Sequence, residues 1–137
     1  MTEAWFWASF QPEIKKMALV MAGGALGAVS RYGIGLWTAK TWGTQFPFGT
    51  LMVNLTGCFL IGLLFTMAER VRFLTPDLRL LILTGYLGAL TTFSTFTLET
   101  VNAGRGGMTL QPLINILINN GGGIGLTFIG MWLGRLR

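Results

Sequence analysis

Four long runs of mostly apolar residues, separated by short polar stretches, constrain the fold of this chain more than any other feature. The runs cover residues 17–38, 48–69, 77–102 and 110–134. Each has roughly the 20 residues that a helix needs to cross a hydrocarbon layer of about 30 Å. Only 11% of the 137 residues are charged, whereas a soluble domain carries roughly 25% charged residues. The chain is therefore predicted to be an all-α integral membrane protein with four transmembrane helices.

The ends of these runs carry residues that begin or interrupt helices. All four prolines lie at or near such ends. Thr75, Pro76 and Asp77 form a good helix start, with a hydroxyl cap, a proline in the first turn and an acid beside the positive end of the helix dipole. These signals support the predicted boundaries.

Residues 1–16 differ from a cleaved signal peptide, because their basic residues follow the aromatic ones. The aromatic residues are Trp5, Phe6, Trp7 and Phe10. Aromatic rings favour the headgroup region of a bilayer. We predict an N-terminal interfacial segment at 1–16 and a four-helix transmembrane domain at 17–137.

The distribution of charge bears on orientation and on partners. The N-terminal arm, the second loop and the C-terminus carry seven lysines and arginines, against two on the opposite side. The positive-inside rule then places both termini in the cytoplasm. This pattern accounts for the net charge of +5, so we expect no nucleic-acid partner. With no histidine and a single cysteine, Cys58, the chain is not expected to be an enzyme.

Small residues recur at spacings of four within the runs. The pairs are Gly23 with Gly27, Gly24 with Ala28, Gly121 with Gly125, and Gly130 with Gly134. Such pairs allow helix backbones to approach closely in membranes. They predict tight packing between the helices.

Polar side chains within the runs need partners, because an unpaired polar group is costly in lipid. Arg31 either reaches the headgroups or places a positive charge at the mouth of an anion path. Asn54 either joins two helices or donates its amide N–H groups into such a path. Asn115 and Asn119 share a helix face, so they either line the same path or join helices.

The stretch 88–96 gathers four hydroxyl groups, those of Thr91, Thr92, Ser94 and Thr95. Each hydroxyl can bond to a carbonyl four residues earlier. Four hydroxyls beside Gly88 also fit an unwound helix whose carbonyls bind a cation. Phe93 and Phe96 share a helix face and either pack or turn electropositive ring edges toward an anion. These residues together indicate a small channel or transporter with donors suited to anions.

Three stretches resemble the family of small fluoride channels called Fluc or CrcB. They are GGALGAVSRY at 23–32, FGTLMVNLTG at 48–57 and GALTTFSTFTLE at 88–99, in the order and spacing of that family. The resemblance covers three of the four runs. It implies a passive channel that lets fluoride leave the cytoplasm and so gives fluoride resistance. It also implies a multi-pass protein of the cell inner (plasma) membrane.

The same resemblance implies an antiparallel, dual-topology dimer with two fluoride pathways at its interface and a break in the third helix. The residues expected along each pathway are Asn54, Phe93, Phe96, Ser94, Thr95, Glu99 and Arg31, with Asn115 and Asn119 as further members. The backbone carbonyls of Gly88 and Thr91, from both subunits, are expected to hold one structural sodium ion on the dimer axis.

Two features depart from the family pattern. Ala89 stands where the family usually has a second glycine. A dual-topology homodimer is expected to carry similar numbers of lysines and arginines on its two sides, whereas this chain carries seven on one side and two on the other. The partner is therefore expected to be either a second copy of the chain or an oppositely oriented homologue.

Two other classes of membrane protein compete with this interpretation. A small multidrug transporter is also an antiparallel four-helix dimer, but it needs a membrane-embedded carboxylate, typically in the first helix, to exchange protons for drugs. The first run has none. A structural or assembly protein would explain the small-residue pairs but not the clustered hydroxyl and phenyl groups.

Overall fold

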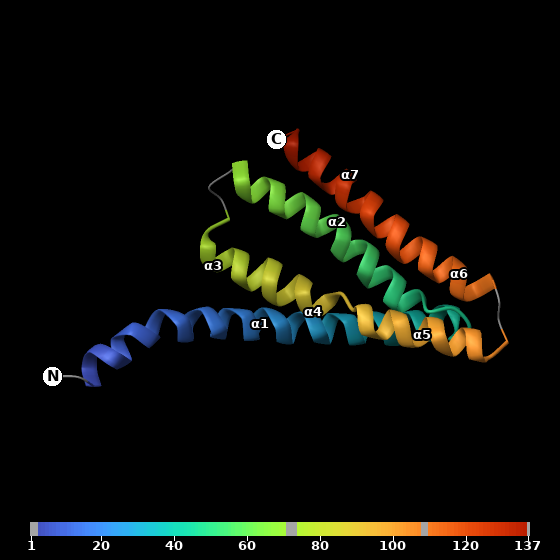
Figure 1. The fold of residues 1–137 in the computed structure, drawn as a ribbon, viewed down its shortest axis with the longest axis horizontal. Coiled ribbons are helices and arrows are strands. Elements are labelled where there is room, and N and C mark those ends of the chain that lie inside the picture. The colour runs from blue at the N-terminus through green and yellow to red at the C-terminus, as the bar shows by residue number, and fades with distance from the viewer. Residues whose placement is uncertain (1–2, 71–73, 108–109, 137) are drawn as a thin grey trace.

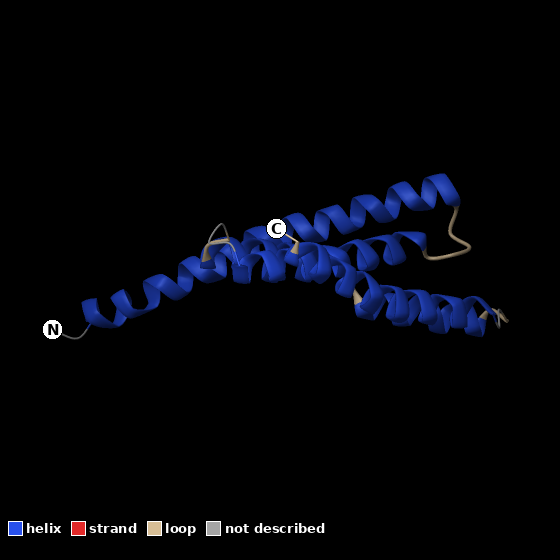
Figure 2. Cartoon of the chain, turned by 90° about the horizontal axis from the view of Figure 1, so that it is seen from above, coloured by secondary structure: helices blue, strands red, loops and turns tan. Residues whose placement is uncertain are grey.

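The structure, a computed structural model, describes residues 3–70, 74–107 and 110–136, with side chains except at 3–12 and 70. The aromatic side chains predicted to lie at the interface, those of Trp5, Phe6, Trp7 and Phe10, fall outside the described set. The described chain is helical throughout, apart from short connections, and contains no strand (Figures 1 and 2).

Within the part of the chain that the structure describes, four helical segments are long and apolar enough to cross a membrane. They are Glu13–Trp42, Phe48–Glu69, Pro76–Arg105 and Leu110–Arg135, with 30, 22, 30 and 26 residues. The four runs predicted from the sequence each fall within one of these segments, so the prediction of four membrane helices is confirmed. The second segment coincides with its run, and the other three extend beyond theirs because their helices continue past the apolar residues into the polar flanks.

The first two segments are single helices, α1 (Glu3–Trp42) and α2 (Phe48–Arg70). The third comprises α3 (Pro76–Arg79), the π-helical η1 (Leu80–Leu87), α4 (Gly88–Leu90) and α5 (Phe93–Arg105). The fourth comprises α6 (Leu110–Leu117), the π-helical η2 (Ile118–Gly122) and α7 (Gly123–Arg135).

The predicted start of the third segment is confirmed. The Thr75 hydroxyl caps α3 by accepting a hydrogen bond from the Leu78 N–H at 3.3 Å, and Pro76 occupies the first turn. Lys15 of α1 pairs with Asp77 at 2.6 Å. The start of α3 therefore lies beside the first segment, as Figure 1 also shows.

Two pairs of helices pack closely through glycine. α2 lies along α7, and α1 lies along η1 (Figure 1). A Cβ atom built on Gly130 would lie 2.3 Å from the Phe59 carbonyl oxygen, and one on Gly23 would lie 2.0 Å from that of Leu81. Only glycine permits these approaches, because real Cβ atoms essentially never come that close. The close packing predicted from the pairs Gly23–Gly27 and Gly130–Gly134 is confirmed.

The other two small-residue pairs behave differently. A Cβ atom on Gly24, Gly121 or Gly125 would meet no atom within 4 Å. These glycines therefore face outward, and close packing through their pairs is not seen within the single chain. The reason is geometric, because neighbouring glycines on one helix point in different directions and only one face meets the adjacent helix.

The third segment changes conformation at two residues after α4. Thr91 has φ −80° and ψ 154°, and Thr92 has φ −151° and ψ 117°, so both are extended. α5 then begins at Phe93, with Thr92 as its cap. Figure 2 marks this point in tan, near the middle of the segment. The buried core of Val53, Leu87 and Leu90 lies just before it.

Candidate functional site

The extended pair in the third segment is held by the side chain of Asn54 from α2. The Thr92 N–H donates to Asn54 Oδ1 at 2.8 Å, and Asn54 Nδ2 donates to the Thr92 carbonyl at 3.1 Å. Backbone groups inside a membrane must find partners within the protein. The amide of Asn54 supplies both a donor and an acceptor, so it replaces the helical partners that Thr92 has lost.

A chain of side-chain hydrogen bonds continues from Asn54 into the fourth segment. Asn54 Nδ2 also donates to Asn119 Oδ1 at 3.0 Å. Asn119 Nδ2 donates to Asn115 Oδ1 at 2.8 Å and to the Asn115 carbonyl at 3.1 Å. We call Asn54, Asn119 and Asn115 the asparagine ladder. The ladder joins α2 to the fourth segment, as one of the two interpretations of these residues predicts, and the interpretation as an ion path stays a prediction.

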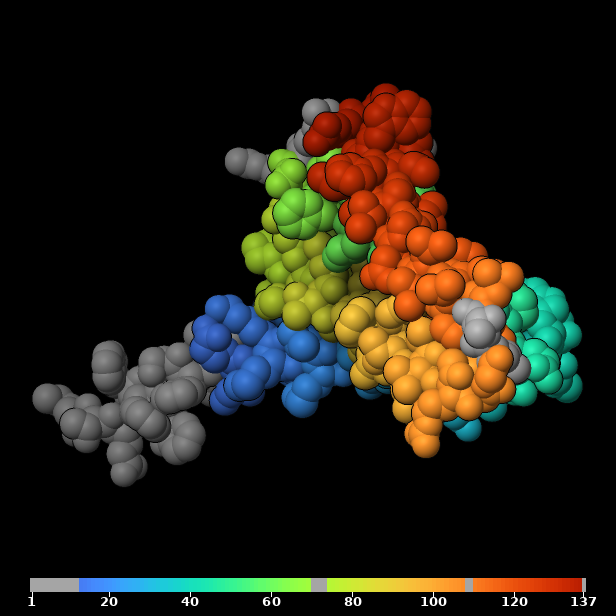
Figure 3. Space-filling view, turned by 45° about the vertical axis from the view of Figure 1, so that its right-hand side comes forward, coloured from blue at the N-terminus to red at the C-terminus, as the bar shows by residue number. Residues whose placement is uncertain are grey.

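The ladder ends on α5, about two turns after the extended pair. Asn115 Nδ2 donates to Thr100 Oγ1 at 2.8 Å, and Thr100 Oγ1 donates to the Phe96 carbonyl at 2.7 Å. α5 and α6 lie against each other here, as the adjoining yellow and orange surfaces in Figure 3 show. From the Thr92 N–H to the Phe96 carbonyl, each group along this route donates to the next; the further bond from Asn54 Nδ2 to the Thr92 carbonyl runs in the opposite direction.

The donors of the ladder are largely committed within the protein. A primary amide has two N–H groups. Those of Asn54 bond to Thr92 and Asn119, and those of Asn119 both bond to Asn115. Asn119 is 9% exposed and Asn115 is 2% exposed. An anion that binds to Asn54 must therefore take the place of one of its present acceptors.

The hydroxyl groups of the stretch 88–96 divide into two sets. Thr91 Oγ1 bonds to the Leu87 carbonyl at 3.0 Å, four residues earlier, as expected for a helical hydroxyl. Thr92 Oγ1 instead accepts from the Thr95 N–H at 3.2 Å and contacts the Thr95 and Ser94 hydroxyls at 3.0 and 3.3 Å. Three hydroxyls therefore gather at the first turn of α5.

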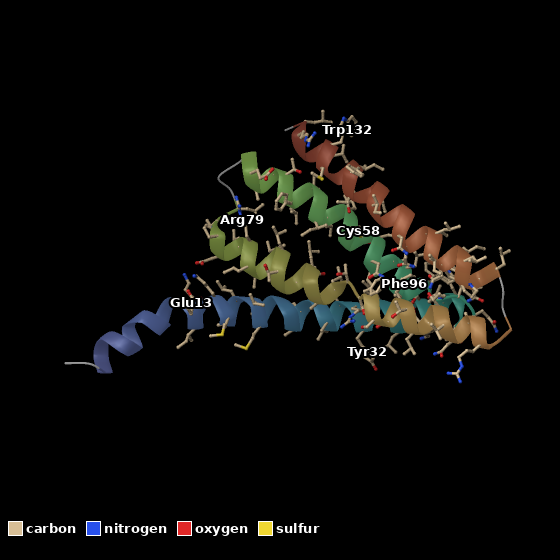
Figure 4. The ribbon with its side chains drawn as sticks, viewed as in Figure 1. Glu13, Tyr32, Cys58, Arg79, Phe96 and Trp132 are labelled. Carbon is tan, nitrogen blue, oxygen red and sulfur yellow. The ribbon has the colours of Figure 1, made fainter. Side chains whose placement is uncertain are left out.

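Phe93 and Phe96 contact each other, as their spacing predicts. Their ring centroids are 5.5 Å apart and the rings are tilted by 51°. Their surroundings differ, since Phe96 is 5% exposed and Phe93 is 71% exposed. In Figure 4 Phe96 lies on the side of α5 that faces the other helices. Phe93 is thus presented on the outer surface of the chain.

Two cavities adjoin Glu99 of α5. One, of about 370 Å³, is lined by residues that include Arg31, Tyr32, Thr92, Thr95 and Glu99. The other, of about 410 Å³, is lined by residues that include Thr50, Glu99, Asn102 and Gln111. Arg31 and Glu99, far apart in the sequence, therefore border the same space. Figure 4 shows Tyr32 on the outer side of α1.

Glu99 is only partly satisfied by its surroundings. The Thr50 hydroxyl donates to its Oε1 atom at 2.9 Å. Its Oε2 atom is buried and has no hydrogen-bond partner among the described residues. The carboxylate thus keeps one free acceptor oxygen between the two cavities.

The backbone at Gly88 and Thr91 is arranged differently from a continuous helix. In such a helix the Thr92 N–H would bond to the Gly88 carbonyl, but here it is directed to Asn54. Gly88 itself is exposed. The described residues contain no group of three or more His, Cys, Asp or Glu that could hold a metal ion. Carbonyl oxygens released at the extended pair are the hard ligands that sodium requires.

Sequence reasoning did not predict the contacts that three residues make in this site. Thr92 receives the Asn54 amide, Thr100 ends the ladder, and Gly57 admits Thr91, whose methyl carbon would lie 2.2 Å from a Cβ atom at that position. The spacing of four between Thr92, Phe96 and Thr100 was a signal, because it places them on one face of the helix.

Together, the fold and the site define a small multi-pass membrane protein with a polar cluster inside its apolar segments. Residues 18–131 match the model of the family described as CrcB-like protein, Camphor Resistance (CrcB), and the chain belongs to this family. The resemblance seen in the sequence is therefore confirmed. This membership gives no support to the multidrug-transporter alternative.

Close relatives match nearly the whole chain. A protein of Acidobacterium capsulatum named Fluoride-specific ion channel FluC is 44% identical over 121 residues, which are 88% of this chain and 94% of the relative. Proteins of the same name from Dehalococcoides mccartyi and Allorhizobium ampelinum are 45% and 42% identical. These matches cover 88% and 89% of this chain, and 93% and 98% of the relatives.

Proposed function

We propose that this protein is a fluoride-selective passive channel that exports fluoride from the cytoplasm and so gives fluoride resistance. The observation that carries the proposal is the amide of Asn54, which is placed inside the apolar segments at the extended Thr91–Thr92 pair. The names of the relatives supply the identity of the ion. The proposed location is the cell inner (plasma) membrane.

The chemistry of the site suits fluoride. Fluoride is small and strongly hydrated, so a path across lipid must replace its water with hydrogen-bond donors. The proposed donors are the Asn54 amide and the hydroxyls of Ser94 and Thr95, with the electropositive ring edges of Phe93 and Phe96 beside them. These side chains lie close together, because Thr92 contacts Asn54, Ser94 and Thr95 directly.

The mouth of the path is proposed to lie at the two cavities beside Glu99. Arg31 borders one of them, and its positive charge would raise the local concentration of anions. The Thr50 hydroxyl orients the Glu99 carboxylate through its bond to Oε1. An anion that passes this carboxylate enters the turn of α5 where the hydroxyls gather.

The proposed functional unit is an antiparallel dimer with two pathways at its interface. Phe93, a ring exposed at 71%, lies on the outer surface together with Gly88. The outward-facing Gly24, Gly121 and Gly125 leave room for another helix backbone. The second subunit is proposed to be a copy of this chain or an oppositely oriented homologue, and the charge bias keeps both possibilities open.

A structural sodium ion is proposed on the axis of that dimer. The carbonyl groups of Gly88 and Thr91 from both subunits would hold it, since the interruption of the third helix at Thr91 and Thr92 leaves them without helical partners. Ala89 is compatible with this arrangement, because no non-glycine residue among those described has a positive φ angle. When bound, the ion would supply a fixed positive charge between the two subunits.

Residues 1–16 are proposed to lie at the membrane surface as an interfacial segment. The backbone continues α1 through this region from Glu3. At the end of this segment, the side chain of Lys16 pairs with that of Glu13 at 2.7 Å. A helix that ends in aromatic and basic residues suits the headgroup layer.

Efflux from liposomes tests the proposal. The purified protein is reconstituted into liposomes loaded with potassium fluoride, and valinomycin is added to balance charge while a fluoride electrode records release. We expect rapid release without a proton gradient and little chloride release from matched liposomes. Release no faster than from protein-free liposomes, or release only with a proton gradient, would contradict the proposal.

A further inference from the structure

Thr100 stands at the far end of the asparagine ladder from Thr92. We propose that Thr100 and Asn115 are positioning residues that set the selectivity of the pathway for fluoride over chloride by holding the ladder in one orientation. This inference rests on the proposed function. Thr100 lies outside the set of residues expected along the pathway, whereas Asn115 was expected there and is here given a supporting role. Neither Asn115 nor Thr100 needs to touch the ion, because both act through Asn119 and Asn54.

The hydroxyl of Thr100 determines the direction of the ladder. A hydroxyl has one hydrogen, and that of Thr100 is given to the Phe96 carbonyl at 2.7 Å, which accepts only. Thr100 Oγ1 can then only accept from Asn115, so Asn115 turns its NH₂ group toward Thr100 and its Oδ1 atom toward Asn119. A single hydroxyl thereby orients the first amide of the series.

The orientation of the Asn115 amide in turn fixes the orientations of the Asn119 and Asn54 amides. Because Asn119 donates both N–H groups to Asn115, its Oδ1 atom faces Asn54 and accepts at 3.0 Å. At the other end, the backbone of Thr92 holds the Asn54 amide through two bonds. The ladder is therefore pinned at both ends, by a main-chain pair and by a hydroxyl.

In this arrangement a single oxygen atom, Asn119 Oδ1, occupies the acceptor position beside Asn54 Nδ2. Both N–H groups of Asn54 are engaged, so an anion that binds there replaces one acceptor. In this proposal it replaces Asn119 Oδ1, because Thr92 is also held to Asn54 by its own N–H group. Fluoride is close in size to an amide oxygen, and chloride is markedly larger. A rigid ladder admits the smaller ion, whereas a loosened ladder can open far enough for the larger one.

The burial of the ladder supports an indirect role for its outer members. Asn115 is 2% exposed and Asn119 is 9% exposed. The route by which they influence an ion is thus the bond from Asn54 to Asn119.

The test compares fluoride and chloride efflux from the same preparation of reconstituted protein. Thr100→Val keeps the shape of the side chain but removes the hydroxyl. We expect the ratio of fluoride to chloride efflux to fall by about fivefold or more, the scale of one neutral hydrogen bond. Thr100→Ser should restore the ratio. Release from protein-free liposomes is subtracted from both fluxes, so that a loss of folded channels lowers them together and leaves their ratio unchanged.

Thr97→Val is the matched control. Thr97 lies on the same helix, and its hydroxyl bonds only to the Ser94 carbonyl of its own helix, at 2.9 Å. This variant should keep the ratio of the unmodified protein. A fall in the ratio as large as that of Thr100→Val would overturn the proposal, because the effect would then not depend on the ladder.

A second variant removes the donor of the bond between Asn115 and Thr100, whereas Thr100→Val removes its acceptor. Asn115→Leu should lower the ratio as Thr100→Val does, and the double variant should show no further fall, since both act on one bond. An unchanged ratio in both single variants, or independent and additive effects, refutes the proposed role. Absence of fluoride efflux from the unmodified protein refutes the channel itself, which is a different outcome.

Discussion

Asn54 and Thr92 are 38 residues apart in the chain, yet the side chain of one completes the backbone of the other. The Asn54 amide accepts from the Thr92 N–H at 2.8 Å and donates to the Thr92 carbonyl at 3.1 Å. This pair joins α2 to the third segment where its backbone is extended. The same amide is one of the proposed donors to the ion.

Replacement of Asn54 by Asp is expected to abolish fluoride efflux. The carboxylate has no N–H group, so it loses the bonds that Asn54 Nδ2 donates to the Thr92 carbonyl and to Asn119, and a charge at membrane depth costs about 3 kcal/mol. Since each 1.4 kcal/mol is a factor of ten, we expect a fall of roughly 100-fold in the efflux rate. The fluoride electrode measures this rate.

The matched control for this position is an asparagine of the fourth segment outside the ladder. Asn120 donates only to the Ile116 carbonyl of its own segment, at 2.9 Å. Asn120→Ala should retain efflux, whereas Asn54→Ala should lose most of it. Equal efflux from these two alanine variants would show that the ladder is not needed for permeation.

The two phenylalanines are expected to respond differently to the same substitution. Phe96→Ile changes a buried ring, so it should lower both the thermal stability in detergent and fluoride efflux. Phe93→Ile changes a ring exposed at 71%, so the stability of the single chain should shift by less than about 0.5 kcal/mol while efflux is lost. Unfolding curves and electrode traces of both variants are the measurements. Normal efflux through Phe93→Ile would remove that ring from the pathway.

Gly57→Ala is expected to disturb the extended pair. The added methyl carbon would lie 2.2 Å from the Thr91 Cγ2 atom, so Thr91 or α2 must shift. Efflux should fall even though Asn54 and both phenylalanines are intact. Gly33→Ala is the comparison, because a Cβ atom there meets nothing within 4 Å. Similar losses of efflux in both variants would argue against a specific contact with Thr91.

Gly130→Ala is expected to destabilise the packing of α2 against α7. The new Cβ atom would lie 2.3 Å from the Phe59 carbonyl oxygen, and overpacking of this kind typically costs 1–3 kcal/mol. The melting temperature of the purified protein should therefore drop. Gly125→Ala, where the Cβ atom meets nothing within 4 Å, should leave the fold of the single chain unchanged. An unaltered melting temperature for Gly130→Ala would contradict the close helix approach.

Much of the fold could be predicted from local signals. Long apolar runs predict the number of membrane helices. Backbone polar groups in a bilayer must be satisfied within the protein, and an apolar run of this length achieves this by forming a helix. The Thr75 cap and the packing glycines Gly23 and Gly130 were also predictable, since each depends on neighbours in the sequence or on one helix face. The sequence could not predict which of the small-residue pairs face another helix of the same chain, because this depends on the rotation of each helix about its axis.

The sequence by itself determined that this chain spans a membrane with four helices, and its motifs placed it in a family of small channels. Only the tertiary structure decided that Asn54 meets Thr92 and that Asn119, 65 residues further along, meets Asn54. It also decided that Phe96 is buried while Phe93 is exposed. The physical reason is that helix formation depends on short-range periodicity. Hydrogen bonds between helices depend instead on how their axes and faces are brought together in space.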